Sequence, residues 1–258
     1  MPQPKLDDRG LAGQTIFVTG AGSGIGRACA IGLAHAGANL ALFDLQSDGI
    51  TALAATIRAQ GVNVSCHTGD ATISAQISSA FHEAAKHHGT IHGGVNSAGI
   101  LGASAELADY PEDVYRRVLD VNVMGVVNAM KPELQLMIKQ GYGSIVNIAS
   151  AAGIIGWAGH SAYVASKHAV VGLTKTAGLE YASRGIRINS VCPAFIYTNM
   201  TGALFAAEGV EDAAIAAHPI GRLGQPEEVA EAVMWLLSSR SSFAVGSNLV
   251  LDGGSTVD

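Results

Sequence analysis

The stretch Thr19-Gly20-Ala21-Gly22-Ser23-Gly24-Ile25-Gly26 decides how the rest of the chain is read. It follows a short apolar run and precedes a segment with apolar residues at helical spacing. A strand that enters a helix through glycines lets a pyrophosphate approach the backbone, and the amides at the helix N-terminus stabilise its charge. The turn therefore predicts a dinucleotide site, with a tight turn in some other α/β protein as the alternative. A phosphate-binding P-loop is excluded, because no Gly-Lys pair occurs in the chain.

Short runs rich in valine and isoleucine alternate with longer segments of helical periodicity along most of the chain. Continuous apolar strands belong to a parallel sheet covered on both faces, and strictly alternating units build a doubly wound fold. We therefore predict an α/β fold with a doubly wound (Rossmann), mostly parallel seven-stranded sheet and helices on both faces. The expected strands are residues 15–19, 39–43, 62–66, 91–95, 144–148, 186–191 and 248–251. The expected helices are residues 25–36, 48–60, 73–88, 111–140 in two pieces, 161–183 and 225–239.

Glycines follow the ends of five expected helices, where a left-handed conformation is common. They are Gly37, Gly61, Gly89, Gly141 and Gly185. No linker, repeat or low-complexity tract interrupts the series, so residues 1–258 are expected to form one domain. Residues 194–222 form a long apolar connection that begins at the carboxyl end of the sixth strand, where such sheets bind ligands. We interpret this stretch as a substrate loop.

The composition excludes several classes of protein. A formal net charge of −6 lacks the basic footprint that binding to nucleic acid requires. No apolar run is long enough to span a membrane, and the first dozen residues have no apolar stretch typical of a secretory signal. The three widely spaced cysteines, Cys29, Cys66 and Cys192, indicate reduced thiols rather than a metal site or disulfides. A soluble cytoplasmic protein without a metal is expected.

Asp44 ends the second expected strand, downstream of the glycine turn. A carboxylate at this place can accept hydrogen bonds from both hydroxyls of a ribose, whereas it would repel a 2′-phosphate. Ser23 and Leu45 stand where a compensating basic residue would be needed. The sequence therefore predicts NAD(H) over NADP(H) as the cofactor, with capping of the turn as the alternative role of Asp44.

Tyr163 and Lys167 are one helical turn apart in an expected helix, so their side chains share a face. An ammonium near a phenol favours the phenolate, and a hydroxyl tuned in this way can act as general acid or base near neutral pH. Ser150 follows the fifth strand and brings a hydroxyl donor to the same sheet edge. Each residue alone is a weak signal, and their combination predicts a catalytic site.

The chain resembles the short-chain dehydrogenase/reductase family over residues 11–254. The resemblance rests on four features in chain order: the glycine turn, Asn96-Ser97-Ala98-Gly99, Ser150 and the Tyr163/Lys167 pair. The resemblance implies a catalytic set in which Tyr163 is the acid/base, Lys167 lowers its pKa, Ser150 orients the substrate and Asn122 completes a proton relay. The implied cofactor-binding residues are Gly20, Ser23, Gly24, Ile25, Gly26, Asp44, Asp70, Ala71, Asn96, Ala98, Gly99, Tyr163, Lys167, Ile196 and Thr198. Ser97 and Ala194 depart from the usual Asn and Gly. Family members are usually tetramers built through the helices that hold Asn122 and Tyr163 and through the last strand, so a homotetramer is expected.

The expected reaction is reversible, NAD(H)-dependent hydride transfer between a secondary alcohol and a ketone. The expected pocket walls are apolar, which favours an apolar or cyclic substrate; they comprise residues 154–160, Phe195, Tyr197, Met200, Leu204 and Phe205. His160 either borders this pocket or packs behind it. Enoyl reductases of the family have a longer spacing between Tyr and Lys, so that subclass is not expected. The alternatives are an enzyme like 3-oxoacyl-carrier-protein reductase and a non-catalytic protein that senses NAD(H).

Overall fold

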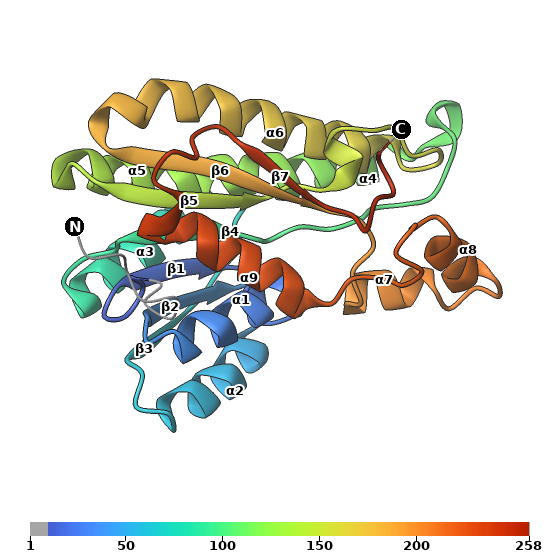
Figure 1. Cartoon of the computed structure of the whole chain (residues 1–258). Coiled ribbons are helices and arrows are strands. Elements are labelled where there is room, and N and C mark those ends of the chain that lie inside the picture. Colours follow the sequence, from blue (N-terminus) through green and yellow to red (C-terminus); the bar gives the residue numbers. More distant parts are fainter. Residues whose placement is uncertain (1–9, 258) are drawn as a thin grey trace.

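The structure, a computed structural model, describes residues 10–257. These residues form a seven-stranded sheet in the order β3-β2-β1-β4-β5-β6-β7, and every neighbouring pair is parallel (Figure 1). The chain runs from β1 outward to β3, crosses back to β4 and continues to β7, which confirms the doubly wound fold. Most of the N-terminal dozen residues and the last residue of the predicted domain lie outside the described range. The strands are β1 (Thr15–Thr19), β2 (Asn39–Asp44), β3 (Val64–Thr68), β4 (Gly93–Asn96), β5 (Gly143–Ile148), β6 (Ile186–Pro193) and β7 (Asn248–Leu251).

Helices cover both faces of the sheet (Figure 1). On one face α1 packs against α2 and α9, and on the other α3 packs against α5 and α4 against α6. The long helices are α1 (Gly24–His35), α2 (Ser47–Arg58), α3 (Ser74–His88), α4 (Glu112–Leu119), α5 (Gly125–Gln140), α6 (Ser161–Tyr181) and α9 (Pro226–Leu237). Among the described residues no helix is both long and apolar enough to cross a bilayer.

Alternating residues of β1 reach opposite layers of the core, because side chains of a strand point to its two faces in turn. Ile16 and Val18 pack into the cluster beneath α1 and α9, whereas Phe17 packs against Phe43 and Phe81 beneath α3. Both faces of the central strands are therefore buried, as the continuous apolar runs predict. The three cysteines are free thiols, two of them buried and one partly buried.

The helix ends agree with the predicted positions of glycine. Gly37, Gly61, Gly89, Gly141 and Gly185 all adopt the left-handed region, with φ between 75° and 83°. The predicted helix 111–140 is indeed in two pieces, because a π-helical segment, Asp120–Met124, separates α4 from α5. The strand β3 begins two residues later than predicted.

The predicted substrate loop contains two short helices, α7 (Asn199–Leu204) and α8 (Val210–Ala216), which project from the body of the molecule at the right of Figure 1. Thr198 begins α7 with a capping box, in which its side chain and that of Thr201 each bond the other's backbone amide. The loop leaves β6 at its carboxyl end, so it lies beside the edge where parallel sheets bind ligands.

Candidate active site

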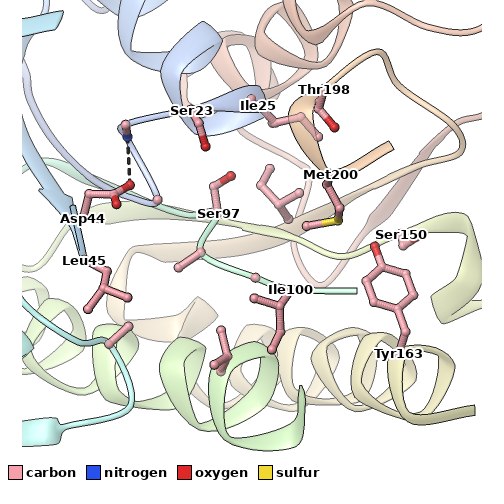
Figure 2. Close-up of a pocket in the computed structure, with 18 of the residues that line it drawn as sticks. Ser23, Ile25, Asp44, Leu45, Ser97, Ile100, Ser150, Tyr163, Thr198 and Met200 are labelled. Carbon is pink, nitrogen blue, oxygen red and sulfur yellow. Dashed lines mark hydrogen bonds between the residues drawn. The ribbon is translucent and has the colours of Figure 1, made fainter. Parts of the chain in front are cut away.

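A cavity of about 420 Å³ lies at the carboxyl ends of the central strands (Figure 2). We call it the cofactor cavity. Thirteen of the predicted site residues line it: Gly20, Ser23, Gly24, Ile25, Asp44, Asp70, Ala71, Ala98, Gly99, Ser150, Tyr163, Lys167 and Thr198. The predicted residues Gly26, Asn96, Asn122 and Ile196 lie outside its lining.

Backbone atoms pack so closely around the glycine turn that a side chain at Gly20 or Gly26 would collide with them. A Cβ on Gly20 would lie 2.8 Å from the amide nitrogen of Ala98, and the φ of Gly20 is +66°. A Cβ on Gly26 would lie 2.2 Å from the carbonyl oxygen of Gly20. Gly26 thus lets α1 pack directly on the turn, although it does not face the cavity. The first turn of α1 consequently opens on the cavity beside Ser23, an arrangement that suits a pyrophosphate.

Asp44 is held at the end of β2 by the same turn. Its Oδ2 accepts a hydrogen bond of 2.9 Å from the amide of Gly22, drawn in Figure 2, and its Oδ1 accepts one of 3.0 Å from the amide of Gln46. A Cβ on Gly22 would come within 3.0 Å of Oδ2. Each carboxylate oxygen keeps a further lone pair for a ribose hydroxyl. The chain therefore fits a dinucleotide cofactor, and Asp44 both closes the turn and faces the cavity.

A cation that the sequence analysis missed also lines the cofactor cavity. Arg117 lies on α4 and is half-exposed, with its guanidinium 3.7 Å from the carboxylate of Asp70. Hydrogen bonds from Thr72, together with Arg117, lower the pKa of Asp70. Arg117 is far in sequence from every glycine motif, so only the packing of α4 beside the loop after β3 reveals it.

Asn96 and Ile196 support the cavity from within the core rather than lining it. Asn96 is buried at the end of β4 and donates hydrogen bonds to Glu133 Oε2 at 3.2 Å and to Asn147 Oδ1 at 3.0 Å. Ile196 packs into the core beneath α1 and α9. The segment that follows each residue reaches the cavity instead, at Ala98 and at Thr198.

Asn122 lies in the π-helical segment and is fully buried. Its Oδ1 accepts a hydrogen bond of 2.8 Å from the amide of Ile100, and its Nδ2 donates to the carbonyl of Ile100 at 2.9 Å and to Ser166 Oγ at 3.0 Å. The side chain thereby fixes the loop after Gly99 against α6. Short π segments inside helices are rare and often occur at functional sites.

Three of the four predicted catalytic residues, Ser150, Tyr163 and Lys167, line the cofactor cavity. Figure 2 shows the hydroxyl of Tyr163 directed at Ser150, and a hydrogen bond between the two side chains opposes the rise in the pKa of Tyr163 that burial causes. Ser150 follows β5, accepts a hydrogen bond of 3.1 Å from the amide of Ala152 and donates one of 3.3 Å to Pro193 O. Tyr163 and Lys167 both come from α6, as predicted.

Lys167 lies against the ring of Tyr163 and is held by the backbone of β5. Its ammonium donates a hydrogen bond of 2.8 Å to the carbonyl of Ile148 and lies 5.6 Å from the ring centroid of Tyr163. Burial lowers the pKa of Lys167 to about 8 and raises the pKa of Tyr163. Burial thus raises the pKa of Tyr163 in the protein chain by itself, and the lowering of this pKa by Lys167 stays a prediction.

A second cavity of about 200 Å³ adjoins the first, and we call it the substrate cavity. Ser150, Tyr163, Ala194, Met200 and Thr201 line both cavities. Of the predicted walls, Ile155, Gly156, Trp157, Phe195, Met200 and Leu204 line it.

Other predicted wall residues lie behind the substrate cavity. His160 stacks on Trp157 with ring centroids 3.7 Å apart, and Phe205 packs on Phe195. Tyr197 turns outward and donates a hydrogen bond of 2.5 Å to Glu211. The sequence analysis missed other lining residues, namely Leu101, Ala151, Ala152, Ala217, His218 and Ser255.

The glycine turn and the Ser150, Tyr163 and Lys167 arrangement agree with what known proteins show. A family model described as Enoyl-(Acyl carrier protein) reductase matches residues 20–256. Cyclohexanol dehydrogenase of Acinetobacter sp. (strain SE19) is 42% identical over 240 residues, which cover 93% of this chain and 94% of that protein. The chain belongs to the short-chain dehydrogenase/reductase family. As a member of this family, it is an oxidoreductase that interconverts an alcohol and a ketone.

Other members of the family show the range of chemistry around this chain. The 3-oxoacyl-[acyl-carrier-protein] reductase of Thermotoga maritima (strain ATCC 43589 / DSM 3109 / JCM 10099 / NBRC 100826 / MSB8) is 37% identical over 244 residues, which cover 95% of this chain and 98% of that protein. The crystal structure of levodione reductase superposes with a TM-score of 0.92 at 33% identity, covering 96% of this chain and 99% of the other.

Similar solved structures differ in the nicotinamide cofactor that they contain. NAD+-bound xylitol dehydrogenase has a TM-score of 0.90 at 34% identity and covers 95% of this chain and 99% of its own. ElxO with NADP bound has a TM-score of 0.88 at 28% identity, and the match covers 95% of this chain and 99% of ElxO. Members of the family bind a nicotinamide cofactor, and the fold alone does not select between its two forms.

Proposed function

We propose that this short-chain dehydrogenase/reductase oxidises a small, largely apolar cyclic secondary alcohol with NAD+ and reduces the corresponding ketone with NADH. The observation that carries the proposal is the junction of the two cavities at Ser150 and Tyr163. With a volume of about 200 Å³, the substrate cavity is smaller than pockets for drug-sized ligands, whose volumes are roughly 300–1,000 Å³. Aromatic and aliphatic side chains form most of its walls, which favours a flat apolar ring.

The residues at the junction divide the reaction between them. When substrate binds, the hydroxyl of Ser150 turns from the carbonyl of Pro193 to donate to the substrate oxygen, and it holds this oxygen beside the hydroxyl of Tyr163. As the phenolate, Tyr163 accepts the hydroxyl proton of the alcohol during oxidation, and as the phenol it returns this proton during reduction. Lys167 supplies positive charge beneath the phenol ring, and Asn122 fixes the loop that closes this side of the site. A bound nicotinamide supplies the acceptor or donor of the hydride.

The choice of NAD(H) rests on the environment of Asp44. Its carboxylate faces the cofactor cavity, and a 2′-phosphate on the adenosine ribose would meet this negative charge. Among the described residues, the basic side chains that line this cavity are Lys167 and Arg117. Arg117 forms an ion pair with Asp70 rather than with Asp44. We infer that no basic side chain compensates a 2′-phosphate beside Asp44.

The proposal is tested with the purified protein and a panel of substrates. The panel contains cyclohexanol, cyclopentanol, 2-propanol and xylitol, each with NAD+ and with NADP+, and a 3-oxoacyl thioester with NADH and NADPH. We expect the highest kcat/KM with a cyclic alcohol and NAD+, measured by NADH absorbance. Faster turnover of the 3-oxoacyl thioester would favour the carrier-protein reductase instead. Binding of NADH without turnover of any substrate would favour the sensing protein.

Substitution of Asp44 tests the cofactor assignment directly. We expect Asp44→Ala to lower kcat/KM for NAD+ about 10- to 100-fold, because the ribose hydroxyls lose their acceptor, and to raise the relative use of NADP+. Asp48→Ala, at an exposed position in the first turn of α2, is the matched control and should leave the ratio unchanged. A wild-type preference for NADP+ would contradict the assignment.

The homotetramer, the single domain over residues 1–258 and the cytoplasmic location stay predictions. A tetramer built through α6 and β7 is supported by apolar side chains that these elements expose, among them Leu179 and Val250. Ala165, Ala169 and Gly172 are also exposed along α6, where small residues permit close helix contact. Sedimentation velocity checks the assembly, and a stable monomer at micromolar concentration would contradict it.

A further inference from the structure

One corner of the cofactor cavity lies beyond Asp44 and has no part in the proposed reaction. Figure 2 shows Asp44 at one end of this cavity and Ser150 with Tyr163 at the other. Thr68, the last residue of β3, pairs with Asp44 in the sheet, and Asp70 follows two residues later. With the adenosine ribose at Asp44, this corner is the space that remains for the adenine base.

The carboxylate of Asp70 is fixed at this corner by its own loop. Its Oδ1 accepts one hydrogen bond of 2.9 Å from the amide of Thr72 and another of 2.8 Å from the hydroxyl of the same residue. Asn128 on α5 holds the loop by donating to the carbonyls of Ala71 and Thr72 at 2.9 and 3.2 Å. The other oxygen, Oδ2, is the one that pairs with Arg117, 3.7 Å away.

Arg117 is held by this carboxylate and is still available to a ligand. Its side chain lines the cofactor cavity and is 50% exposed. The ion pair with Asp70 is longer than a hydrogen bond, so it leaves donors of the guanidinium for another partner. The neighbouring Arg116 differs, because its guanidinium bonds to Glu112 on α4 itself and does not line the cavity.

The corner offers apolar surface beside this cation. Ala71 and Val121 are buried residues that line the cavity, and the exposed Leu45 lines it as well. Adenine is an uncharged aromatic base with two apolar faces. A guanidinium is attracted to the face of an aromatic ring and stacks on it readily. The corner therefore combines the two kinds of surface that a purine base requires.

We propose that Arg117 binds the adenine base of the cofactor, and that Asp70 anchors the guanidinium in place for this contact. The inference rests on the proposed function, because it requires a dinucleotide in the cofactor cavity with its adenosine ribose at Asp44. It adds a binding residue from α4, an element without a cofactor motif. The identity of the alcohol does not enter into it.

The test measures binding to the protein free of cofactor by isothermal titration calorimetry. NADH is titrated directly, and its two halves, AMP and reduced nicotinamide mononucleotide, are measured by displacement of NADH. Each half carries one phosphate, so the pair separates an effect on the base from an effect on charge. We expect Arg117→Met to raise the Kd of NADH and of AMP about three- to fivefold, the effect of one cation–π contact at an exposed site. The Kd of reduced nicotinamide mononucleotide should not change.

A matched control removes the same charge from the adjacent position. Arg116→Met should leave all three dissociation constants as in wild type, because Arg116 lies outside the cavity lining. Thermal unfolding establishes that each variant is folded, and Arg117→Gln carries the test if the methionine variant is not.

An analogue of the cofactor separates a contact with the ring from an effect through Asp70. In reduced nicotinamide hypoxanthine dinucleotide, a carbonyl oxygen replaces the amino group of adenine while the aromatic ring system is retained. Direct contact with the ring predicts that Arg117→Met weakens binding of this analogue by the same factor as binding of NADH. A loss confined to NADH would mean that Arg117 acts on the amino group through Asp70, and it would overturn the direct contact.

The remaining outcomes distinguish the two proposals. If Arg117→Met binds AMP as wild type does, or loses as much affinity for reduced nicotinamide mononucleotide as for AMP, the inference is overturned while the proposed function stands. If the wild-type protein binds NADH and oxidises no cyclic alcohol, the proposed function fails, and the binding data still decide the role of Arg117. If the wild-type protein binds no NADH, both fail.

Discussion

The cofactor cavity and the substrate cavity adjoin, but different physical requirements shape them. In the cofactor cavity, several residue types are dictated by their neighbours, as at Gly20, where a Cβ would collide with the backbone of Ala98. The substrate cavity is assembled from segments far apart in sequence, and most of its walls need only an apolar side chain of suitable size. The first cavity can therefore be recognised from a motif, whereas the second can vary from one family member to another without loss of the fold. The comparison teaches that a motif identifies the class of reaction and leaves the substrate open.

The largest effect is expected at the junction of the two cavities. Tyr163→Phe should lower kcat for alcohol oxidation about 10³-fold, because the acid/base hydroxyl is lost, while NADH binds with nearly wild-type affinity. Steady-state kinetics and a fluorescence titration measure the two quantities. Tyr142→Phe, at an exposed tyrosine, is the control and should behave as wild type. Unchanged kcat in Tyr163→Phe would remove the catalytic role from this site.

A pair of glycine substitutions tests whether the cofactor cavity tolerates less change than the substrate loop. Gly26→Ala places a methyl group 2.2 Å from the carbonyl of Gly20, so it should lower the free energy of unfolding by about 1–3 kcal/mol and weaken NADH binding. Gly202→Ala lies in α7 of the substrate loop with nothing within 4 Å, and it should raise stability by up to about 1 kcal/mol. Urea unfolding and NADH titration measure both variants. Equal losses would show that the two regions are not built differently.

A smaller and pH-dependent effect is expected in the core beneath the cofactor cavity. Glu133 is fully buried in α5, and burial raises its pKa to about 8, against the opposing hydrogen bond from Asn96. The folded protein therefore holds this proton more tightly than the unfolded chain does. The contribution of Glu133 to stability is complete below about pH 4.5 and decreases as the pH rises toward 8.

Glu133→Gln keeps the shape of the side chain and removes this dependence. Its free energy of unfolding relative to wild type should therefore increase by about 1–3 kcal/mol between pH 5 and pH 8.5. Urea unfolding at the two pH values gives the difference. If the difference in free energy of unfolding between Glu133→Gln and wild type is the same at both pH values, Glu133 is already ionised in the folded protein at the lower pH.

The sequence predicts the fold and the cofactor cavity well, because local requirements control both. The five glycines after helices are visible from periodicity, and Asp44 is visible as the last residue of an apolar run. The resemblance predicts Asn96 and Ile196 at the cofactor, but their side chains point into the core. A resemblance gives the position of a residue along the chain and does not give the direction of its side chain. Arg117 and His218 carry no motif, and the sequence offers no signal for them. Only the packing of α4 and of the loop after α8 brings them to the cavities.

The residues shared by the two cavities connect their binding equilibria. Ser150, Tyr163, Ala194, Met200 and Thr201 contribute surface to both, so a ligand in one cavity alters the surface that the other ligand meets. The factor by which the cofactor changes the dissociation constant of the alcohol then equals the factor by which the alcohol changes that of the cofactor. Tighter binding of the alcohol in the ternary complex is therefore accompanied by equally tighter binding of the nucleotide. A substitution in the shared wall is therefore expected to change the affinity for the cofactor together with the choice of substrate.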